Sequence, residues 1–209
     1  MKIEPELIGG WLRARSVARG LALPVAELGG WRVDTNQPHE LRRYVFAGPD
    51  QGLRLLAQRI DEPRVYLKMC GSEEEMRPLL SGHWAFDEPR FVMTGEGFAA
   101  RSVPLAAGYS VQLYRNGATV TVRIVARNGE LAASGYAAET GGVFIYDQIN
   151  TAEPHRRRGL ASHLMQVLRS TRQSPASTPI LVATEAGQGL YQSLGWHTLS
   201  PYTTAHIPR

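Results

Sequence analysis

The stretch from Ile149 to Ser162 reads I-N-T-A-E-P-H-R-R-R-G-L-A-S and joins two segments with different hydrophobic patterns. Before it, residues 143–149 are rich in β-branched and aromatic side chains, which predicts a buried strand. After it, Leu160, Leu164 and Leu168 recur at every fourth position, which predicts an amphipathic helix. The sequence therefore predicts a strand, a basic turn that contains glycine, and a helix.

This turn has the chemistry of an anion-binding site. Arg156, Arg157 and Arg158 supply positive charge and forked hydrogen-bond donors. Gly159 has no side chain, so a ligand can approach the backbone closely there. The first N–H groups of a helix have no partner within the helix, and the helix dipole favours negative charge beside them. The turn thus predicts a phosphate or pyrophosphate cradle, with a solvated helix start or a nucleic-acid patch as alternatives.

Two motifs in this half of the chain resemble the GNAT superfamily of N-acetyltransferases. Arg156-x-x-Gly159-x-Ala161 resembles its acetyl-CoA pyrophosphate loop, whose pattern is Gln/Arg-x-x-Gly-x-Gly/Ala. The run L-Y-Q-S-L-G-W over residues 190–196 resembles its second signature, Leu-Tyr-x-x-x-Gly-Phe/Trp. One predicted helix and one predicted strand separate the two motifs, in the order of the family. The resemblance covers about residues 105–209.

The resemblance implies an α/β fold of the α+β kind, with a mixed sheet and an additional N-terminal α/β lobe. We divide the chain into that lobe, residues 1–100, and an acetyl-CoA-binding catalytic domain, residues 101–209. The lobe repeats an order of helix, strand, short helix, Gly-x-Trp and strand. From Gly52 to Trp84 there are 32 residues, and from Gly159 to Trp196 there are 37. A degenerate half-repeat of the same fold is one interpretation, and shared α/β periodicity is the other.

The resemblance also implies a reaction, in which an amine attacks acetyl-CoA directly and takes its acetyl group. Acetyl-CoA would be a cosubstrate, and no metal would be needed. A bulge at the end of the strand before the basic turn would splay two parallel strands apart. Tyr191 matches the general acid of the family, and its reference pKa near 10 keeps the phenol protonated at neutral pH. The residues expected to contact acetyl-CoA are Ile149, Asn150, Thr151, Arg156, Arg157, Arg158, Gly159, Leu160, Ala161 and Ser162.

Asp147 is the predicted catalytic base. It lies two residues before Ile149, so strand alternation predicts that both side chains share one face. Members of the family often use a strand carboxylate at this place, directly or through water. An aspartate that is satisfied by local amides or by an arginine is the alternative, and Glu139 and His155 are further candidates for the base.

Composition and charge narrow the function classes. The chain has 209 residues, of which 43% are hydrophobic and 20% charged, as in ordinary globular proteins. The single cysteine, Cys70, excludes an internal disulfide. No apolar run reaches the length of a membrane span and the start lacks a signal-peptide pattern, so we expect no membrane partner and a cytoplasmic location. Residues 1–100 hold 13 basic and 14 acidic side chains, whereas residues 101–209 hold 10 basic and 5 acidic side chains. The excess of positive charge therefore lies in the half that contains the arginine turn.

The expected partner is a small-molecule or peptide amine acceptor, whose identity the sequence leaves open. The oligomeric state is open too, a homodimer included. Trp11, Trp31, Trp84 and Tyr44 are candidates to line the acceptor site, although core packing also explains such aromatic residues. Two other function classes are a non-catalytic acyl-CoA-binding or regulatory module and a nucleic-acid-binding protein. The near-neutral N-terminal half and the lack of interleaved aromatic and basic residues argue against nucleic acid, and Tyr191 argues against a non-catalytic module.

Overall fold

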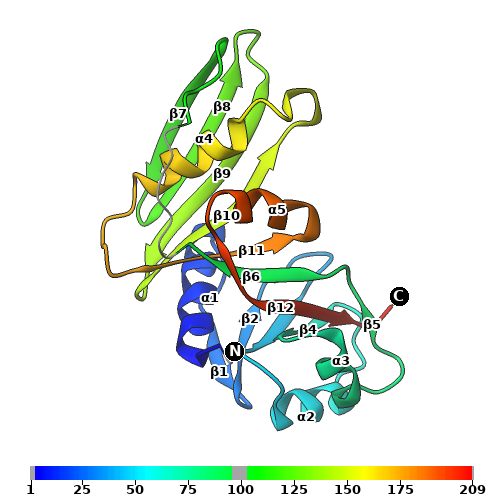
Figure 1. Ribbon diagram of the computed structural model, residues 1–209. Coiled ribbons are helices and arrows are strands. Elements are labelled where there is room, and N and C mark those ends of the chain that lie inside the picture. Colours follow the sequence, from blue (N-terminus) through cyan, green and yellow to red (C-terminus); the bar gives the residue numbers. More distant parts are fainter. Residues whose placement is uncertain (1–2, 96–102, 209) are drawn as a thin grey trace.

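Strands from both halves of the sequence join in one twelve-stranded sheet (Figure 1). The structure is a computed structural model that describes residues 3–95 and 103–208. Its helices are α1 (Pro5–Arg19), α2 (Gln51–Arg59), α3 (Glu73–Met76), α4 (Leu160–Arg169) and α5 (Glu185–Ser193), with short 3₁₀ turns at Arg77–Leu79 and Glu153–His155. Its strands are β1 (Val25–Glu27), β2 (Gly30–Asp34), β3 (Arg42–Phe46), β4 (Val65–Cys70), β5 (Ala85–Phe86), β6 (Arg90–Thr94), β7 (Tyr109–Asn116), β8 (Thr119–Ala126), β9 (Leu131–Thr140), β10 (Val143–Thr151), β11 (Thr178–Thr184) and β12 (His197–His206).

The strand order shows how the two sequence halves interlock. Along the sheet the order is β1-β2-β3-β4-β12-β6-β11-β10-β9-β8-β7, and β5 pairs with β12 beside this path. The last strand of the N-terminal half, β6, therefore pairs with β11 of the C-terminal half. In return, the last strand of the chain, β12, pairs with β4. The halves exchange their final strands, and β6 and β12 also pair with each other.

Among the strands of the described residues only two pairs are parallel, and they occupy equivalent places in the two halves. They are β3 with β4, which α2 connects, and β10 with β11, which α4 connects. Each connection is a crossover helix, as parallel neighbours require. The repeated order of helix, strand, short helix and strand that the sequence predicts is thus present in the connectivity. The mixed α/β fold class is confirmed.

The helices cover the two faces of the sheet and define three cores. On one face α1 packs across both halves, with Ile8, Trp11 and Leu12 against Val45 and Ile145 and their neighbours. On the other face, α4 covers the sheet of the C-terminal half. The N-terminal half has its own core, in which α2 and α3 pack on β3 and β4. The first helix of the chain therefore ties the two halves together on one face (Figure 1).

Side-chain caps fix the starts of two helices in the N-terminal half. Asp50 is the N-cap of α2 and accepts a hydrogen bond from the Gly52 amide at 2.7 Å. Ser72 and Glu75 form a capping box at the start of α3, bonded in both directions.

The division at residue 100 stays a prediction, and that boundary lies outside the described residues. What the structure adds is that each half contributes a strand to the sheet of the other. Common origin of the two halves also stays a prediction. None of the helices in residues 3–95 and 103–208 is long and apolar enough to span a membrane.

Two helical glycines, Gly52 in α2 and Gly189 in α5, test how closely α2 packs on the turn between β1 and β2. A Cβ at Gly52 would lie 1.7 Å from the backbone oxygen of Leu28, whereas a Cβ at Gly189 has nothing within 4 Å. We expect Gly52→Ala to lower the free energy of unfolding by about 2 kcal/mol or more. Gly189→Ala should raise it by up to about 1 kcal/mol, because alanine is the better helix former. Urea unfolding measures both. Equal effects of the two changes would contradict the close packing of α2 on the β1–β2 turn.

Candidate active site

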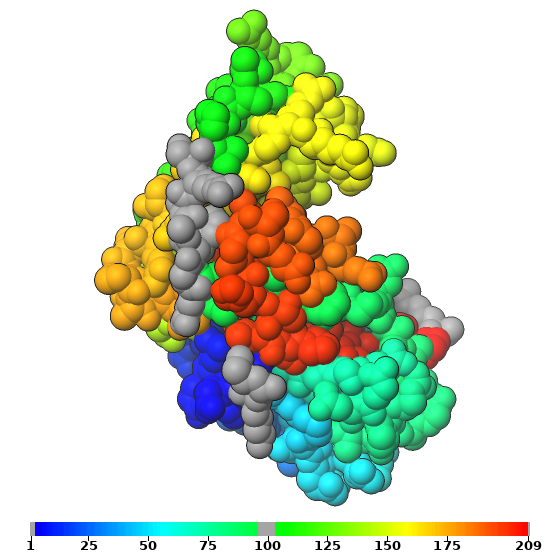
Figure 2. Space-filling view, viewed as in Figure 1, coloured from blue at the N-terminus to red at the C-terminus, as the bar shows by residue number. Residues whose placement is uncertain are grey.

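The site lies where β10 and β11 separate. These parallel strands pair only at Val143–Thr178, Phe144–Pro179 and Ile145–Ile180. Beyond Ile145 they diverge, and a cavity of about 1140 Å³ opens between them. Figure 2 shows a deep notch between the end of β10, coloured yellow, and α5, coloured orange. The equivalent pair in the N-terminal half, β3 and β4, stays paired along all of β3 and leaves no such opening.

A β-bulge shapes the end of β10. The pairing with β9 shifts between Asp147 and Asn150, so Gln148 and Ile149 together oppose Gly135. Gln148 has a φ of 51°, a left-handed conformation that is uncommon for a residue other than glycine. A Cβ at Gly135 would lie 2.4 Å from Cδ1 of Ile149, so the glycine makes room for the bulged side chain. The bulge that the resemblance implies is confirmed.

The same bulge overturns the predicted alternation of side chains. Asp147 bonds to arginines of α1, on one face of the sheet. Ile149 packs on the core beneath α4, on the opposite face. The prediction that both share a face was wrong, because one extra residue in a strand reverses the alternation beyond it.

The basic turn forms one wall of the cavity. Arg156 and Arg157 line it, and Arg157 has a φ of 59°. Gly159 is the N-cap of α4 with a φ of 72°, a conformation that favours glycine, and no side chain caps the helix. The N-terminal amides of α4 therefore remain available to an anion. Arg158 instead bonds to the Tyr109 hydroxyl at 3.0 Å and does not line the cavity.

All the other predicted cofactor residues line this cavity: Ile149, Asn150, Thr151, Gly159, Leu160, Ala161 and Ser162. The hydroxyl of Thr151 is buried and has no hydrogen-bond partner within the described chain. The uncapped helix start, the glycine beside it and this free hydroxyl fit a ligand that carries phosphates and amides. These residues would hold acetyl-CoA. Within residues 3–95 and 103–208, no group of three or more His, Cys, Asp or Glu side chains is placed to hold a metal ion.

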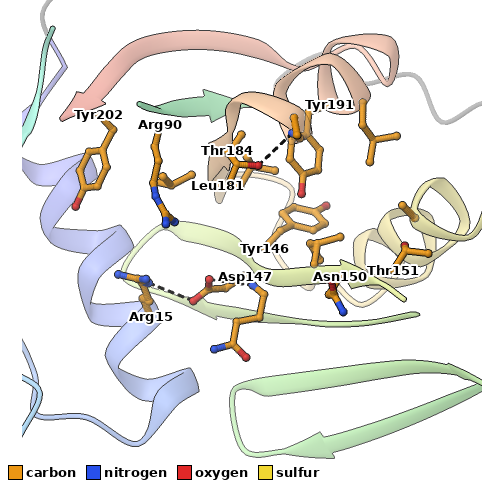
Figure 3. Close-up of a pocket in the computed structure, with 18 of the residues that line it drawn as sticks. Arg15, Arg90, Tyr146, Asp147, Asn150, Thr151, Leu181, Thr184, Tyr191 and Tyr202 are labelled. Atoms are coloured by element: carbon orange, nitrogen blue, oxygen red, sulfur yellow. Dashed lines mark hydrogen bonds and ion pairs between the residues drawn. The ribbon is translucent and has the colours of Figure 1, made fainter. Parts of the chain in front are cut away.

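Tyr191 lies on the wall opposite the basic turn. It is 7% exposed, lines the cavity and packs against Trp196, with ring centroids 6.1 Å apart. Figure 3 shows its side chain pointing from α5 toward β10. Burial and the negative charge of Asp147 raise the pKa of Tyr191 to about 12, so its hydroxyl stays protonated well above neutral pH. Gly195, with a φ of 84°, ends the segment after α5 and lets Trp196 turn into the core.

Asp147 is held by α1. Its carboxylate accepts hydrogen bonds from Arg19 Nε and Nη2, both at 2.8 Å, and from the Tyr136 hydroxyl at 3.0 Å. It also accepts one from Arg15 Nε at 3.2 Å (Figure 3). Burial alone would raise the pKa of Asp147, but the two arginines outweigh it and lower that pKa below its ordinary value. The further candidates differ in place. His155 lines the cavity and bonds to Tyr109, whereas Glu139 bonds to the turn at Gln173 and Ser174 and does not line it.

Most cavity residues of the N-terminal half belong to no sequence motif and were not predicted. Of the four aromatic candidates only Trp11 lines the cavity, and Trp31, Trp84 and Tyr44 pack elsewhere. The unpredicted lining residues of this half are Arg15, Arg19, Glu40, Arg43, Lys68, Asp87 and Arg90, and β12 adds Tyr202. Two signals could have found some of them. Arg15 and Arg19 stand one helical turn apart, and Lys68 interrupts an apolar strand.

No protein-family model and no functionally curated protein matches the sequence. Solved structures do resemble the fold. A GCN5-related N-acetyltransferase from Kribbella flavida superposes with a TM-score of 0.66 at 14% identity, over 98% of this chain and 96% of its own. A second GCN5-related N-acetyltransferase, from Sphaerobacter thermophilus, superposes with a TM-score of 0.54 at 13% identity, over 87% of this chain and 78% of its own. A tandem GNAT protein from the clavulanic acid biosynthesis pathway superposes with a TM-score of 0.52 at 14% identity, over 75% of this chain and 68% of its own.

The first of these likenesses covers 98% of the chain and therefore includes the N-terminal half, which has no recognisable motif. The chain therefore has the fold of the GNAT superfamily, as its two sequence motifs predict.

Proposed function

We propose that the protein is an acetyl-CoA-dependent N-acetyltransferase that acts on a primary amine by direct attack. One observation carries the proposal. The cavity between β10 and β11 brings the two predicted motifs together, with Arg156 and Gly159 on one wall and Tyr191 on the other. The anion-binding turn and the proton donor thus face the same space.

The proposed reaction forms one bond and breaks one. The amine nitrogen bonds to the carbonyl carbon of the thioester, and the carbon–sulfur bond breaks. The amine loses one proton to a base, and the departing thiolate gains one proton. The products are an acetylated amine and free CoA. The protein has to align the two substrates, stabilise the negative oxygen that develops and move these two protons.

The chain supplies groups for each of these tasks. Beyond Ile145 the edge of β10 that faces β11 has no strand partner, so its main chain is free to bind the amide groups of the cofactor arm. The turn at Arg156–Gly159 binds the pyrophosphate. Tyr191 donates a hydrogen bond and then its proton to the thiolate. Because the pKa of Tyr191 is raised to about 12, its hydroxyl stays protonated at neutral pH.

Asp147 stays the proposed base, and it has a second role that the structure supports. Its bonds to Arg15 and Arg19 hold α1 against β10. These ion pairs lower the pKa of Asp147, which makes it a weak base for an ammonium group. Proton removal and helix positioning can be separated by experiment, as described below.

Calorimetric titration with acetyl-CoA tests the cofactor site. We expect wild-type protein to bind, and Arg156→Ala to bind at least about tenfold more weakly, because a charge-assisted contact is lost. Arg158→Ala should have the smaller effect, since Arg158 is bonded to Tyr109. Arg54→Ala, an exposed arginine on α2, is the matched control. Absence of binding by the wild type would contradict the proposal.

Replacement of Tyr191 by phenylalanine tests the chemistry. The change removes one hydroxyl from a packed ring, so the fold and the affinity for acetyl-CoA should be retained. We expect kcat to fall by about 10²-fold or more, because the leaving thiolate loses its proton donor. Release of the CoA thiol in the presence of an amine measures it. Full activity would remove Tyr191 from the mechanism, and binding without turnover by the wild type would support a non-catalytic acyl-CoA module instead.

Asp147→Asn separates the two roles of this carboxylate. Because the ion pairs in the folded protein lower the pKa of Asp147 below its ordinary value, they stabilise the fold above about pH 4 and lose that effect as the pH falls further. We expect the variant to lose about 2 kcal/mol of unfolding free energy at neutral pH. The difference from wild type should shrink at acid pH. If Asp147 is also the base, kcat falls by about 10²-fold while the variant is still folded; unchanged kcat would leave only the positioning role.

A further inference from the structure

The cavity continues past the cofactor site toward α1 and the N-terminal half. We define this part, the acceptor end, by side chains that all line the cavity: Arg15, Arg19, Glu40, Arg43, Lys68, Asp87, Arg90, Asp147 and Tyr202. Five of these nine side chains carry positive charge and three carry negative charge. The acceptor end thus has a surplus of cations.

The same surplus of positive charge is found in two groups of ion pairs, one largely buried and one half-buried. In the first group, the carboxylate of Glu40 forms ion pairs with two cationic side chains. Glu40 Oε2 lies 2.8 Å from Nη2 of Arg43, and Glu40 Oε1 lies 3.1 Å from Nζ of Lys68. In the second group, Asp147 alone serves both Arg15 and Arg19. Each group contains two cationic side chains and one carboxylate, so one positive charge in each group is not balanced.

Two further hydrogen-bond donors at the acceptor end have no partner. The Nε atom of Arg43 and the hydroxyl of Tyr202 are buried and unbonded within the described chain. Both residues are 4% exposed. A buried donor without a partner is destabilising, so two such donors that line a cavity call for a functional explanation. Both groups can donate to a ligand oxygen.

Arg90 extends this set of donors. It is opposite Tyr202 on β12 and opposite Thr184 on β11, so its neighbours on both sides belong to the cavity wall. Figure 3 shows its guanidinium group pointing toward the space between Tyr202 and Arg15. The side chain of Arg90 forms no hydrogen bond or ion pair with any residue in the described ranges. It adds one more positive charge to the acceptor end.

The pKa values of Lys68 and Arg43 respond to burial and to the neighbouring positive charges. Burial, together with the nearby Arg43 and Arg15, lowers the pKa of Lys68 to about 8, despite Glu40. Burial and the charge of Arg15 likewise lower the pKa of Arg43. A ligand that brings negative charge would reverse both effects, and one that brings a further cation would increase them.

The CoA phosphates do not account for this cluster. The turn expected to bind them, at Arg156 and Gly159, adjoins α4 on one face of the sheet. The acceptor end adjoins α1 on the other face, where Asp147 and Tyr202 lie. The anion that these donors fit therefore belongs to the second substrate.

We propose that the acceptor end binds an oxyanion of the amine substrate, so that the protein acetylates amines that also carry a carboxylate or a phosphate. Arg15, Arg43, Arg90 and the Tyr202 hydroxyl are its specificity-determining groups. The inference deepens the proposed function and rests on it. A polyamine or a lysine-rich peptide does not fit, because it would add positive charge to a site that already has a surplus.

A panel of primary amines in matched pairs tests the inference. Leucine is compared with leucinamide, and O-phosphoethanolamine with ethanolamine, by release of the CoA thiol. We expect the acidic member of a pair to have at least about tenfold higher kcat/KM. The two pairs also distinguish a carboxylate from a phosphate. A preference for neutral amines or for polyamines would overturn the inference.

Two variants connect the preference to the proposed donors. Tyr202→Phe and Arg90→Gln should each raise KM for the acidic amine about tenfold or more while the kinetics of its neutral partner change little. Arg123→Gln, an exposed strand arginine outside the cavity, is the matched control. A merely structural role would change both members of a pair alike. Equal effects on both members would overturn the inference.

Acetyl-CoA binding distinguishes failure of the inference from failure of the proposed function. If acetyl-CoA binds and an amine is acetylated without any preference for acids, the proposed function holds and the inference is wrong. If acetyl-CoA does not bind, thermal stabilisation by the same amines is measured instead. Stabilisation by the acidic members that Tyr202→Phe abolishes would then support an oxyanion site by itself, and its absence would overturn that too.

Discussion

The separation of β10 and β11 beyond Ile145 is the feature on which the rest of the site depends. Two adjacent parallel strands normally continue their hydrogen bonds to the end, as β3 and β4 do. Here the bulge at Gln148 and Ile149 bends β10 away after three paired positions. The main chain that is left unpaired is the edge that we propose binds the cofactor, and the gap forms the cavity. Gly135 permits this bend, because any larger residue would collide with Ile149.

The exchange of final strands explains why the N-terminal half has no separate site and still contributes to this one. Its own parallel pair stays closed, so it forms a packed core with α2 and α3 rather than a cleft. Through β6 it supplies Arg90, and through β3 and β4 it supplies Arg43 and Lys68. One half thus provides the expected cofactor contacts, and the other provides most of the charge at the acceptor end.

The contact between α1 and β10 contributes both to the stability of the fold and to the charge of the cavity. Asp147 is held by two arginines that lie one helical turn apart on α1, and the same arginines line the cavity. A carboxylate in this setting is a firm structural anchor and a weak base. The positive charge that surrounds it is more than one carboxylate can balance, which makes the acceptor end electrostatically selective.

Local sequence patterns determined the secondary structure of this protein and pointed to the basic turn that we propose binds the cofactor. The leucine periodicity of α4, the glycine at position 159 and the motif around Tyr191 each depend on neighbours within a few positions. The position of Asp147 relative to Ile149 could not be read in the same way, because a single bulged residue reverses alternation and has no reliable sequence signal. The cluster of Arg15, Arg43, Lys68 and Arg90 was decided only by the tertiary structure. These residues are far apart in sequence, and only the exchanged strands and the placement of α1 across both halves bring their charges to one cavity.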